Sequence, residues 1–182
     1  MKMVYNRRYY LRLLLKKHSF PQGLNVTTIS NYTYEEMTIG QSTEYSKTLT
    51  EDDIAMFAAV SGDVNPVHLD ATFAAGTMFG QRIGHGAWTG GVISAALAMQ
   101  MPGPGTIYLG QSISFRKPVF IGDTITVTLP VTEKDDDKQF VTLDCLVVNQ
   151  AGKKVATGTA QVIAPPEKLT LDAPTLPPIS IG

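Results

Sequence analysis

The sequence predicts an α+β domain in which an apolar helix is followed by consecutive antiparallel strands. Residues 87–101 (AWTGGVISAALAMQM) have helical character and are apolar or small on every side, which is typical of a helix buried all round. Beyond residue 106, apolar and polar residues alternate with the period of two that strands show. Short polar loops separate these alternating segments, so we expect neighbouring strands to form hairpins.

Length and composition restrict the class of protein. The chain has 182 residues, enough for one ordinary domain, and its 43% hydrophobic content is that of a globular protein. With 15 Lys and Arg against 16 Asp and Glu, it lacks the basic field of a general nucleic-acid binder. The single cysteine, Cys145, excludes an intrachain disulfide framework and a cysteine-based zinc cluster, and the three histidines lack metal-ligand spacing.

The two ends of the chain differ in composition from its middle. Residues 1–41 form a basic N-terminal extension, in which six basic residues precede the first acidic one, Glu35. Such a start is compatible with a mitochondrial presequence, a membrane-surface helix or a loose extension. Residues 165–182 contain five prolines and are expected to form a tail or linker. The domain itself is therefore expected over residues 42–164.

Two helices are expected within the domain. Thr50 is a suitable N-cap for a helix over 51–61, because the acidic run at 51–53 places negative charge on its first turn. An apolar stripe follows at positions 54, 57 and 58, and Gly62 can end the helix. The second helix, 87–101, is too short and too rich in polar and glycine residues for a membrane span, and none is expected.

Four strands are expected after the second helix. They cover residues 107–115, 124–131, 141–147 and 155–163. The loops 134–138 (KDDDK) and 150–153 (QAGK) are expected to connect hairpins, which makes the sheet antiparallel.

A polar loop between the two helices carries the candidate catalytic residues. Within SGDVNPVHLD (61–70), Asn65-Pro66 indicates a turn that can bring Asp63 and His68 together on a loop. A carboxylate beside an imidazole can move protons at neutral pH. The alternative is structural: Asp63 satisfies loop amides and His68 is a hydrogen-bonded loop histidine. No G-x-S-x-G occurs, so a serine nucleophile of that type is not indicated.

The Gly84-His85-Gly86 segment immediately precedes the second helix. Backbone N–H groups at a helix N-terminus can receive negative charge, such as that on a thioester oxygen that becomes enolate-like. The glycines also suit a tight turn, and both roles can hold together. His85 itself is expected to pack or to form a hydrogen bond rather than to catalyse.

Three stretches resemble the MaoC-like, (R)-specific enoyl-CoA hydratases. They are FAAVSGDVNPVHLDATFA (57–74), RIGHGAWTGGVISA (82–95) and IYLGQSISFRKPVFIGDTITV (107–127), and their D-x-N-P-x-H motif is specific in this context. The resemblance implies a hot-dog fold, an antiparallel sheet wrapped around a long helix. It also implies a homodimer that adds water to trans-2-enoyl-CoA without a cofactor or metal, giving (R)-3-hydroxyacyl-CoA.

The same resemblance assigns roles to individual residues. Asp63 holds and deprotonates the water, His68 exchanges the proton at the α-carbon, and the Gly86 N–H is the oxyanion donor. The supporting residues are Ser61, Asn65 and Ser94. Three basic residues are candidates for binding the nucleotide phosphates of the acyl-CoA: Arg82, Arg116 and Lys117.

Other functions remain open from the sequence. The same chemistry on an acyl-carrier protein would make the chain a 3-hydroxyacyl-ACP dehydratase, and a hot-dog module that only binds acyl thioesters should lack the Asp/His pair. Hot-dog thioesterases are a third option, disfavoured by their different sequence setting. The proline-rich end is similar to linkers that join MaoC-like domains to phosphate acyltransferase domains in bacteria. That similarity favours a bacterial cytoplasmic location over the mitochondrial matrix.

Overall fold

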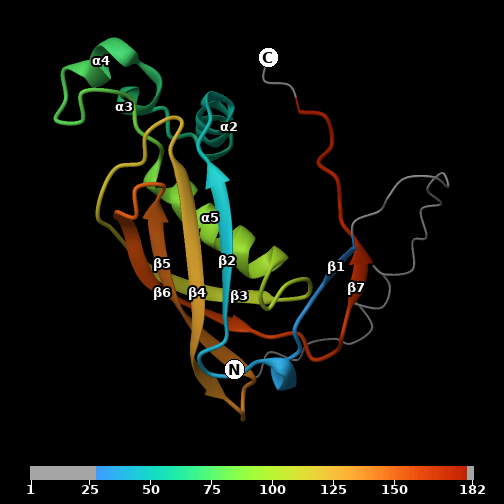
Figure 1. Ribbon diagram of the computed structural model, residues 1–182. Coiled ribbons are helices and arrows are strands. Elements are labelled where there is room, and N and C mark those ends of the chain that lie inside the picture. Colours follow the sequence, from blue (N-terminus) through green and yellow to red (C-terminus); the bar gives the residue numbers. More distant parts are fainter. Residues whose placement is uncertain (1–27, 180–182) are drawn as a thin grey trace.

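The computed structural model describes residues 28–179, which form a five-stranded antiparallel sheet packed on one long helix (Figure 1). The helix is α5 (Gly86–Met99). The strands, in their order across the sheet, are β2 (Ser42–Thr48), β4 (Thr124–Asp135), β5 (Phe140–Asn149), β6 (Lys154–Ile163) and β3 (Ile107–Phe115). The α+β class is confirmed, as are the four strands expected after α5.

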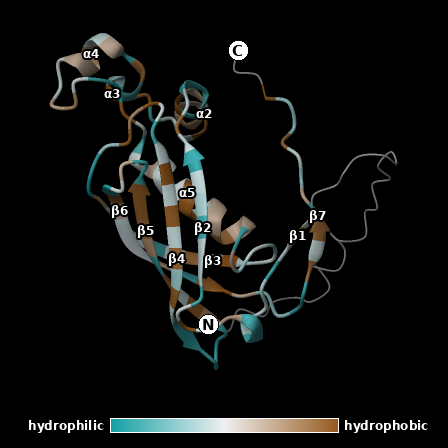
Figure 2. Cartoon of the chain, in the orientation of Figure 1, coloured by the Kyte–Doolittle hydropathy of each residue, from teal (hydrophilic) through white to brown (hydrophobic). Residues whose placement is uncertain are grey.

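One face of the sheet forms the hydrophobic core with α5. Along β4 and β5 every second side chain is buried, and the bands of alternating hydropathy are visible in Figure 2. The buried set comprises Ile125, Val127, Leu129, Val131, Val141, Leu143, Cys145 and Val147. Since burying a large aliphatic side chain contributes about 1.5–3 kcal/mol, this alternation is the main reason for the register of the strands.

The hairpins are confirmed, but β3 has a different neighbour. β5 pairs with β4 and β6 as expected, whereas β3 pairs with β6 at one edge of the sheet. The segment 116–123 therefore crosses from β3 to β4. On its way the Val119 carbonyl accepts from the Gly84 N–H at 2.7 Å, and the Asp123 carbonyl accepts from the Leu49 N–H at 2.9 Å. This crossing holds the starts of α5 and α2 close to each other.

Helix α5 is buried on one side only, so the prediction of burial all round is wrong. Its buried residues are Trp88, Thr89, Val92, Ile93, Ala96 and Leu97. Ala87, Gly91 and Ala98 are exposed on the opposite face. The sequence pattern could not distinguish these cases, because small apolar residues occupy both faces. Within residues 28–179 nothing covers this face.

Three short helices gather at one end of the sheet (Figure 1). They are α2 (Glu51–Ser61), α3 (Pro66–Leu69) and α4 (Ala71–Ala75). α2 has the predicted bounds, with Thr50 as its N-cap and Gly62 ending it at a left-handed φ of 77°. Asp70 caps α4 by accepting from the amides of residues 72 and 73. These helices carry the polar loop that contains the D-x-N-P-x-H motif.

The folded unit extends on both sides of the expected 42–164. The strands β1 (Thr28–Ser30) and β7 (Thr170–Asp172) pair with each other. Met37, which directly follows the 3₁₀ helix η1 (Tyr34–Glu36), is buried in the core. These elements are too short for a periodic signal. The β2 strand also escaped prediction, because its inward positions, 43, 45 and 47, include a threonine and a lysine.

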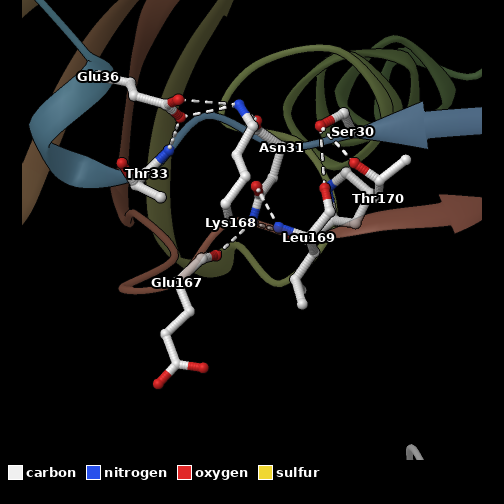
Figure 3. Close-up of polar contacts among 9 residues, drawn as sticks. Ser30, Asn31, Thr33, Glu36, Glu167, Lys168, Leu169 and Thr170 are labelled. Atoms are coloured by element: carbon white, nitrogen blue, oxygen red, sulfur yellow. Dashed lines mark hydrogen bonds and ion pairs between the residues drawn. The ribbon is translucent and has the colours of Figure 1, made fainter.

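Polar contacts attach the start of the proline-rich segment to the domain (Figure 3). The side chain of Asn31 is buried and donates to the carbonyls of Pro104 and Glu167, while it accepts from the Leu169 N–H at 2.9 Å. Lys168 forms an ion pair with Glu36 at 2.9 Å. The first part of the expected tail, through residue 172, is therefore integrated into the fold.

Residues 28–179 contain no helix long and apolar enough to cross a membrane. The basic positions that suggested a presequence or a membrane-surface helix fall in 1–27, outside the described residues.

We expect Gly158→Ala to disrupt the pairing of β3 with β6. A Cβ at this position would lie 2.0 Å from the Ser112 carbonyl oxygen, so one of the two strands must move. The free energy of unfolding should fall by about 2 kcal/mol or more in urea titrations. The control is Gly110→Ala, where a Cβ meets no atom within 4 Å and the change should be within about 0.5 kcal/mol. Equal stability of the two variants would contradict this expectation.

Candidate active site

The N-terminus of α2 is anchored by a capping box. The Asp53 carboxylate accepts from the Thr50 N–H at 2.9 Å and from the Thr50 hydroxyl at 2.8 Å, and it pairs with Lys47 at 3.1 Å. Burial acts to raise the pKa of Asp53, but these hydrogen bonds and the ion pair outweigh it and hold the pKa below its ordinary value. A firmly anchored α2 fixes the position of the loop that follows it.

Asp63 lies in that loop, directly after the residue that ends α2. The Ser61 hydroxyl donates to the Phe57 carbonyl at 2.6 Å and accepts from the Asp63 N–H at 3.1 Å. The Asp63 carboxylate accepts from the Asn65 N–H at 3.2 Å, and 51% of its side chain is exposed. Asp63 is thus held mainly through its backbone, and its carboxylate is open to water.

His68 lies on the one-turn helix α3 rather than on a loop, which corrects the prediction for this residue. The cause is local: Asn65 is the N-cap, its side chain accepts from the Val67 N–H at 3.2 Å, and Pro66 fits the first helical position. Asn65 thus shapes the start of the segment that carries His68.

The hydrogen bonds of His68 define which ring nitrogen faces Asp63. Nδ1 of the buried His68 lies 2.8 Å from the Ile83 carbonyl oxygen, which can only accept, so Nδ1 carries a proton. Nε2 lies 4.0 Å from Oδ2 of Asp63. That distance is too long for a direct hydrogen bond, but it lets one water molecule bond to both atoms at about 2.8 Å.

Gly86 is the first residue of α5, where backbone N–H groups have no acceptor within the helix. A Cβ at this position would lie 2.9 Å from the ring of Phe115, so a side chain here would have to displace that ring. The amide donor and the tight packing that the sequence suggested for Gly86 occur together. The N-terminus of α5 thus offers a donor beside the Asp63 and His68 pair.

His85 lies at the centre of this arrangement and is only 2% exposed. Its Nε2 is 2.9 Å from the Asp63 carbonyl oxygen, and its ring centroid is 3.8 Å from that of His68 and 4.9 Å from that of Phe57. Sequence reasoning predicted a packing or hydrogen-bonding residue but not that it joins both members of the pair. Its place directly before Gly86 was the available signal.

The structure brings together a set of groups that the spacing of the histidines did not suggest. Nitrogen or carboxylate atoms of Asp63, His68 and His85 lie within 4.8 Å of one another. The two imidazole rings lie one over the other, tilted by 31° with centroids 3.8 Å apart. One nitrogen of each ring is also bound to a carbonyl oxygen. This geometry suits proton transfer better than metal coordination.

The remaining predicted residues lie around this centre. Ser94 is half-buried two turns along α5, and no hydrogen bond joins it to Asp63 in the described part of the chain. Arg82 pairs with Glu51 at the start of α2. Arg116 donates to the Thr157 hydroxyl at 3.1 Å, and the neighbouring Lys117 is exposed. The last two follow Phe115 in the sequence, and the Phe115 ring lies against Gly86.

Comparisons with known proteins show which family and fold the chain resembles. Residues 35–151 match the family model described as MaoC like domain. An (R)-specific enoyl-CoA hydratase from Rhodospirillum rubrum is 46% identical over 134 residues, covering 72% of this chain and 91% of that protein. An (R)-specific enoyl-CoA hydratase from Aeromonas caviae is 43% identical and covers 72% of this chain and 98% of that protein. The unliganded structure of the R-hydratase PhaJ1 from Pseudomonas aeruginosa has a TM-score of 0.82 and 51% identity, covering 86% of this chain and 100% of that one.

We expect Asp53→Asn to weaken the anchor of α2 in a pH-dependent way. The asparagine loses the ion pair with Lys47 and the charge on the first turn, which should cost about 1 kcal/mol of unfolding free energy at pH 7. Because the pKa of Asp53 is lowered by folding, its contribution is present above the unfolded-state pKa. The difference between wild type and variant should therefore shrink as the pH falls through the folded-state pKa.

Urea titrations of both proteins between pH 7 and pH 3 measure this difference. A gap that stays constant over that range would show that the charge of Asp53 is not what anchors the helix.

Proposed function

This chain belongs to the MaoC-like domain family, and on that basis we propose that it reversibly adds water to a trans-2-enoyl-CoA to give the (R)-3-hydroxyacyl-CoA. The fold is the hot-dog arrangement of that family. One observation carries the proposal. His68 Nε2 lies 4.0 Å from Asp63 Oδ2, and the pair lies beside the N-terminus of α5.

The proton transfers follow from the geometry of the pair. In the hydration direction the Asp63 carboxylate takes a proton from the attacking water, whose oxygen bonds to the β-carbon. The His68 imidazolium gives the proton on Nε2 to the α-carbon. Because the Ile83 carbonyl holds the proton on Nδ1 in both charge states, exchange with the substrate takes place at Nε2. A water between the two residues then returns the proton from Asp63 to His68, and dehydration is the exact reverse.

The backbone of Gly86 supplies the electrostatic part of catalysis. As negative charge develops on the thioester oxygen, the Gly86 N–H donates to it, and the dipole of α5 favours the same charge. A positioned acid–base pair contributes roughly 10²–10⁴-fold and an oxyanion donor about 10²–10³-fold. Together they account for proton exchange at a carbon atom near neutral pH. We propose that no metal or organic cofactor takes part, since these side chains supply every proton transfer.

Arg82, Arg116 and Lys117 are proposed to meet the phosphates of the CoA nucleotide at the rim of the site. All three are cationic and lie on segments that contact it. We also place the reaction in the bacterial cytoplasm, since the relatives at 43–46% identity come from bacteria. An association with a phosphate acyltransferase domain stays a sequence-based prediction.

We further propose that the enzyme is a homodimer. β3 is an edge strand with an unpaired side, its Leu109 is 43% exposed, and the small residues of α5 leave a flat uncovered face. An open strand edge and an apolar helix face are features that a second copy can bury together.

Asp63→Asn and His68→Gln should each lower the hydration rate by about 10²–10⁴-fold while the fold is kept, because each removes one proton-transfer group. The loss of enoyl absorbance with crotonyl-CoA measures the rate, and a stereospecific dehydrogenase identifies the product as (R). Circular dichroism controls for folding. A near-normal rate in either variant would refute the assignment.

The behaviour of the wild-type protein separates the alternatives. Turnover of enoyl-CoA supports the proposal. Turnover only of an enoyl thioester on acyl-carrier protein would favour the 3-hydroxyacyl-ACP dehydratase, and tight binding of acyl-CoA without turnover would favour a binding module.

Light scattering after size exclusion should give twice the 19.7 kDa mass of one chain. Leu109→Asp places a charge on the open edge strand and should shift the protein towards monomer. Lys153→Asp, on an exposed turn of the β5–β6 connection, is the control and should leave the mass unchanged. A wild-type mass of one chain would overturn the dimer.

A further inference from the structure

We propose that His85 is a positioning residue for the reaction: its Nε2–H, bonded to the Asp63 carbonyl oxygen, sets the Asp63 carboxylate against His68. This inference rests on the proposed function and adds to it a residue that does not itself exchange protons with the substrate. It differs from the sequence-based view, in which His85 only packs or forms a hydrogen bond.

His85 is connected to each of the three groups that carry the chemistry. It bonds to the backbone of Asp63 at 2.9 Å, its ring lies 3.8 Å from that of His68, and it is joined by a peptide bond to Gly86. A displacement of this one side chain would therefore change the distances among all three. The side chain has no freedom to move, because it is buried and packed between His68 and Phe57.

The position of the Asp63 carboxylate depends on its backbone. The side chain is half exposed and receives one long hydrogen bond, from the Asn65 N–H at 3.2 Å. The backbone is held on its N–H side by Ser61 and on its carbonyl side by His85. The Ser61 contact comes from the end of α2, two residues away, whereas His85 is the N-cap of α5, which is packed on the sheet. Among residues 28–179 the His85 bond is therefore the one that ties the backbone of Asp63 to the α5 side of the site.

The protonation of His85 follows from its partner. The carbonyl oxygen of Asp63 can only accept, so Nε2 carries the proton and Nδ1 of the neutral ring has a free lone pair. Nδ1 is buried and has no hydrogen-bond partner among residues 28–179. An unpartnered buried nitrogen lowers stability, and an apolar ring would fill the same space without this cost. The Nε2–H bond therefore positions Asp63, while the unsatisfied Nδ1 lowers the stability of the fold.

Two substitutions separate the hydrogen bond from the packing of the ring. His85→Phe keeps an aromatic ring but removes the donor, whereas His85→Gln keeps an N–H donor at a similar distance from the backbone and removes the ring. We expect His85→Phe to lower kcat about 10–100-fold with little change in KM and no loss of thermal stability. His85→Gln should recover most of the lost kcat.

A matched control is Thr89→Val, which also makes a buried polar position on the first turns of α5 apolar. Thr89 has no hydrogen bond to Asp63 among residues 28–179, so this variant should keep kcat near the wild-type value. If His85→Phe does not fold, His85→Leu serves as the donor-free variant.

The results decide the proposal in either direction. It is overturned if a folded donor-free variant keeps the wild-type kcat, or if His85→Gln is impaired as strongly as His85→Phe. Nitrogen-15 NMR of the wild-type imidazoles adds a test that needs no activity: a proton on Nε2 of His85 supports the bond, and a neutral ring protonated on Nδ1 overturns it. A wild-type enzyme that turns over no enoyl thioester would instead refute the proposed function.

Discussion

The attachment of α5 to the inner face of the sheet is the constraint on which the site depends. Trp88, Val92 and Leu97 pack into the core, which fixes where the helix begins. The segment just before it is held to the β3–β4 crossing by the bond between the Gly84 N–H and the Val119 carbonyl. Asp63 and His68 each receive or make a hydrogen bond with residues of that segment. Burial of the apolar face of α5 thus positions Asp63 and His68, although neither residue is part of the hydrophobic core.

The two members of the pair have opposite environments. His68 is buried and its Nδ1 is occupied by a carbonyl, so it can present only Nε2 to a substrate. Asp63 is half exposed and has one carboxylate oxygen free of backbone contacts, so it can receive water from solvent. A hydratase needs this difference, because one group must meet the carbon atom and the other must meet the incoming water. The change from loop to helix at Asn65 and Pro66 produces this difference, because it places Asp63 on the loop and His68 on α3.

The sequence predicted the features that local chemistry determines. The bounds of α2 follow from the capping of Thr50 and the left-handed turn at Gly62, and the strands follow from alternation along β4 and β5. It could not predict features that depend on distant contacts. β1 and β7 are three-residue strands about 140 positions apart, and the exposed face of α5 is composed of the same small residues as parts of its buried face. The role of His85 was hidden for the same reason, since its partners come from another part of the chain.

The site also illustrates how function limits stability in this fold. His85 keeps a buried Nδ1 that has no hydrogen-bond partner among residues 28–179, a choice that packing alone would not favour. The rest of the structure offsets this cost with a continuous core of apolar side chains and with the clasp that Asn31 and Lys168 form between the two ends of the domain. The clasp lies among β1, β7 and the loop after α5, whereas Asp63 and His68 lie beside α2 and on α3. The clasp is thus separate from the catalytic groups, while the packing of α5 on the sheet both stabilises the domain and positions them.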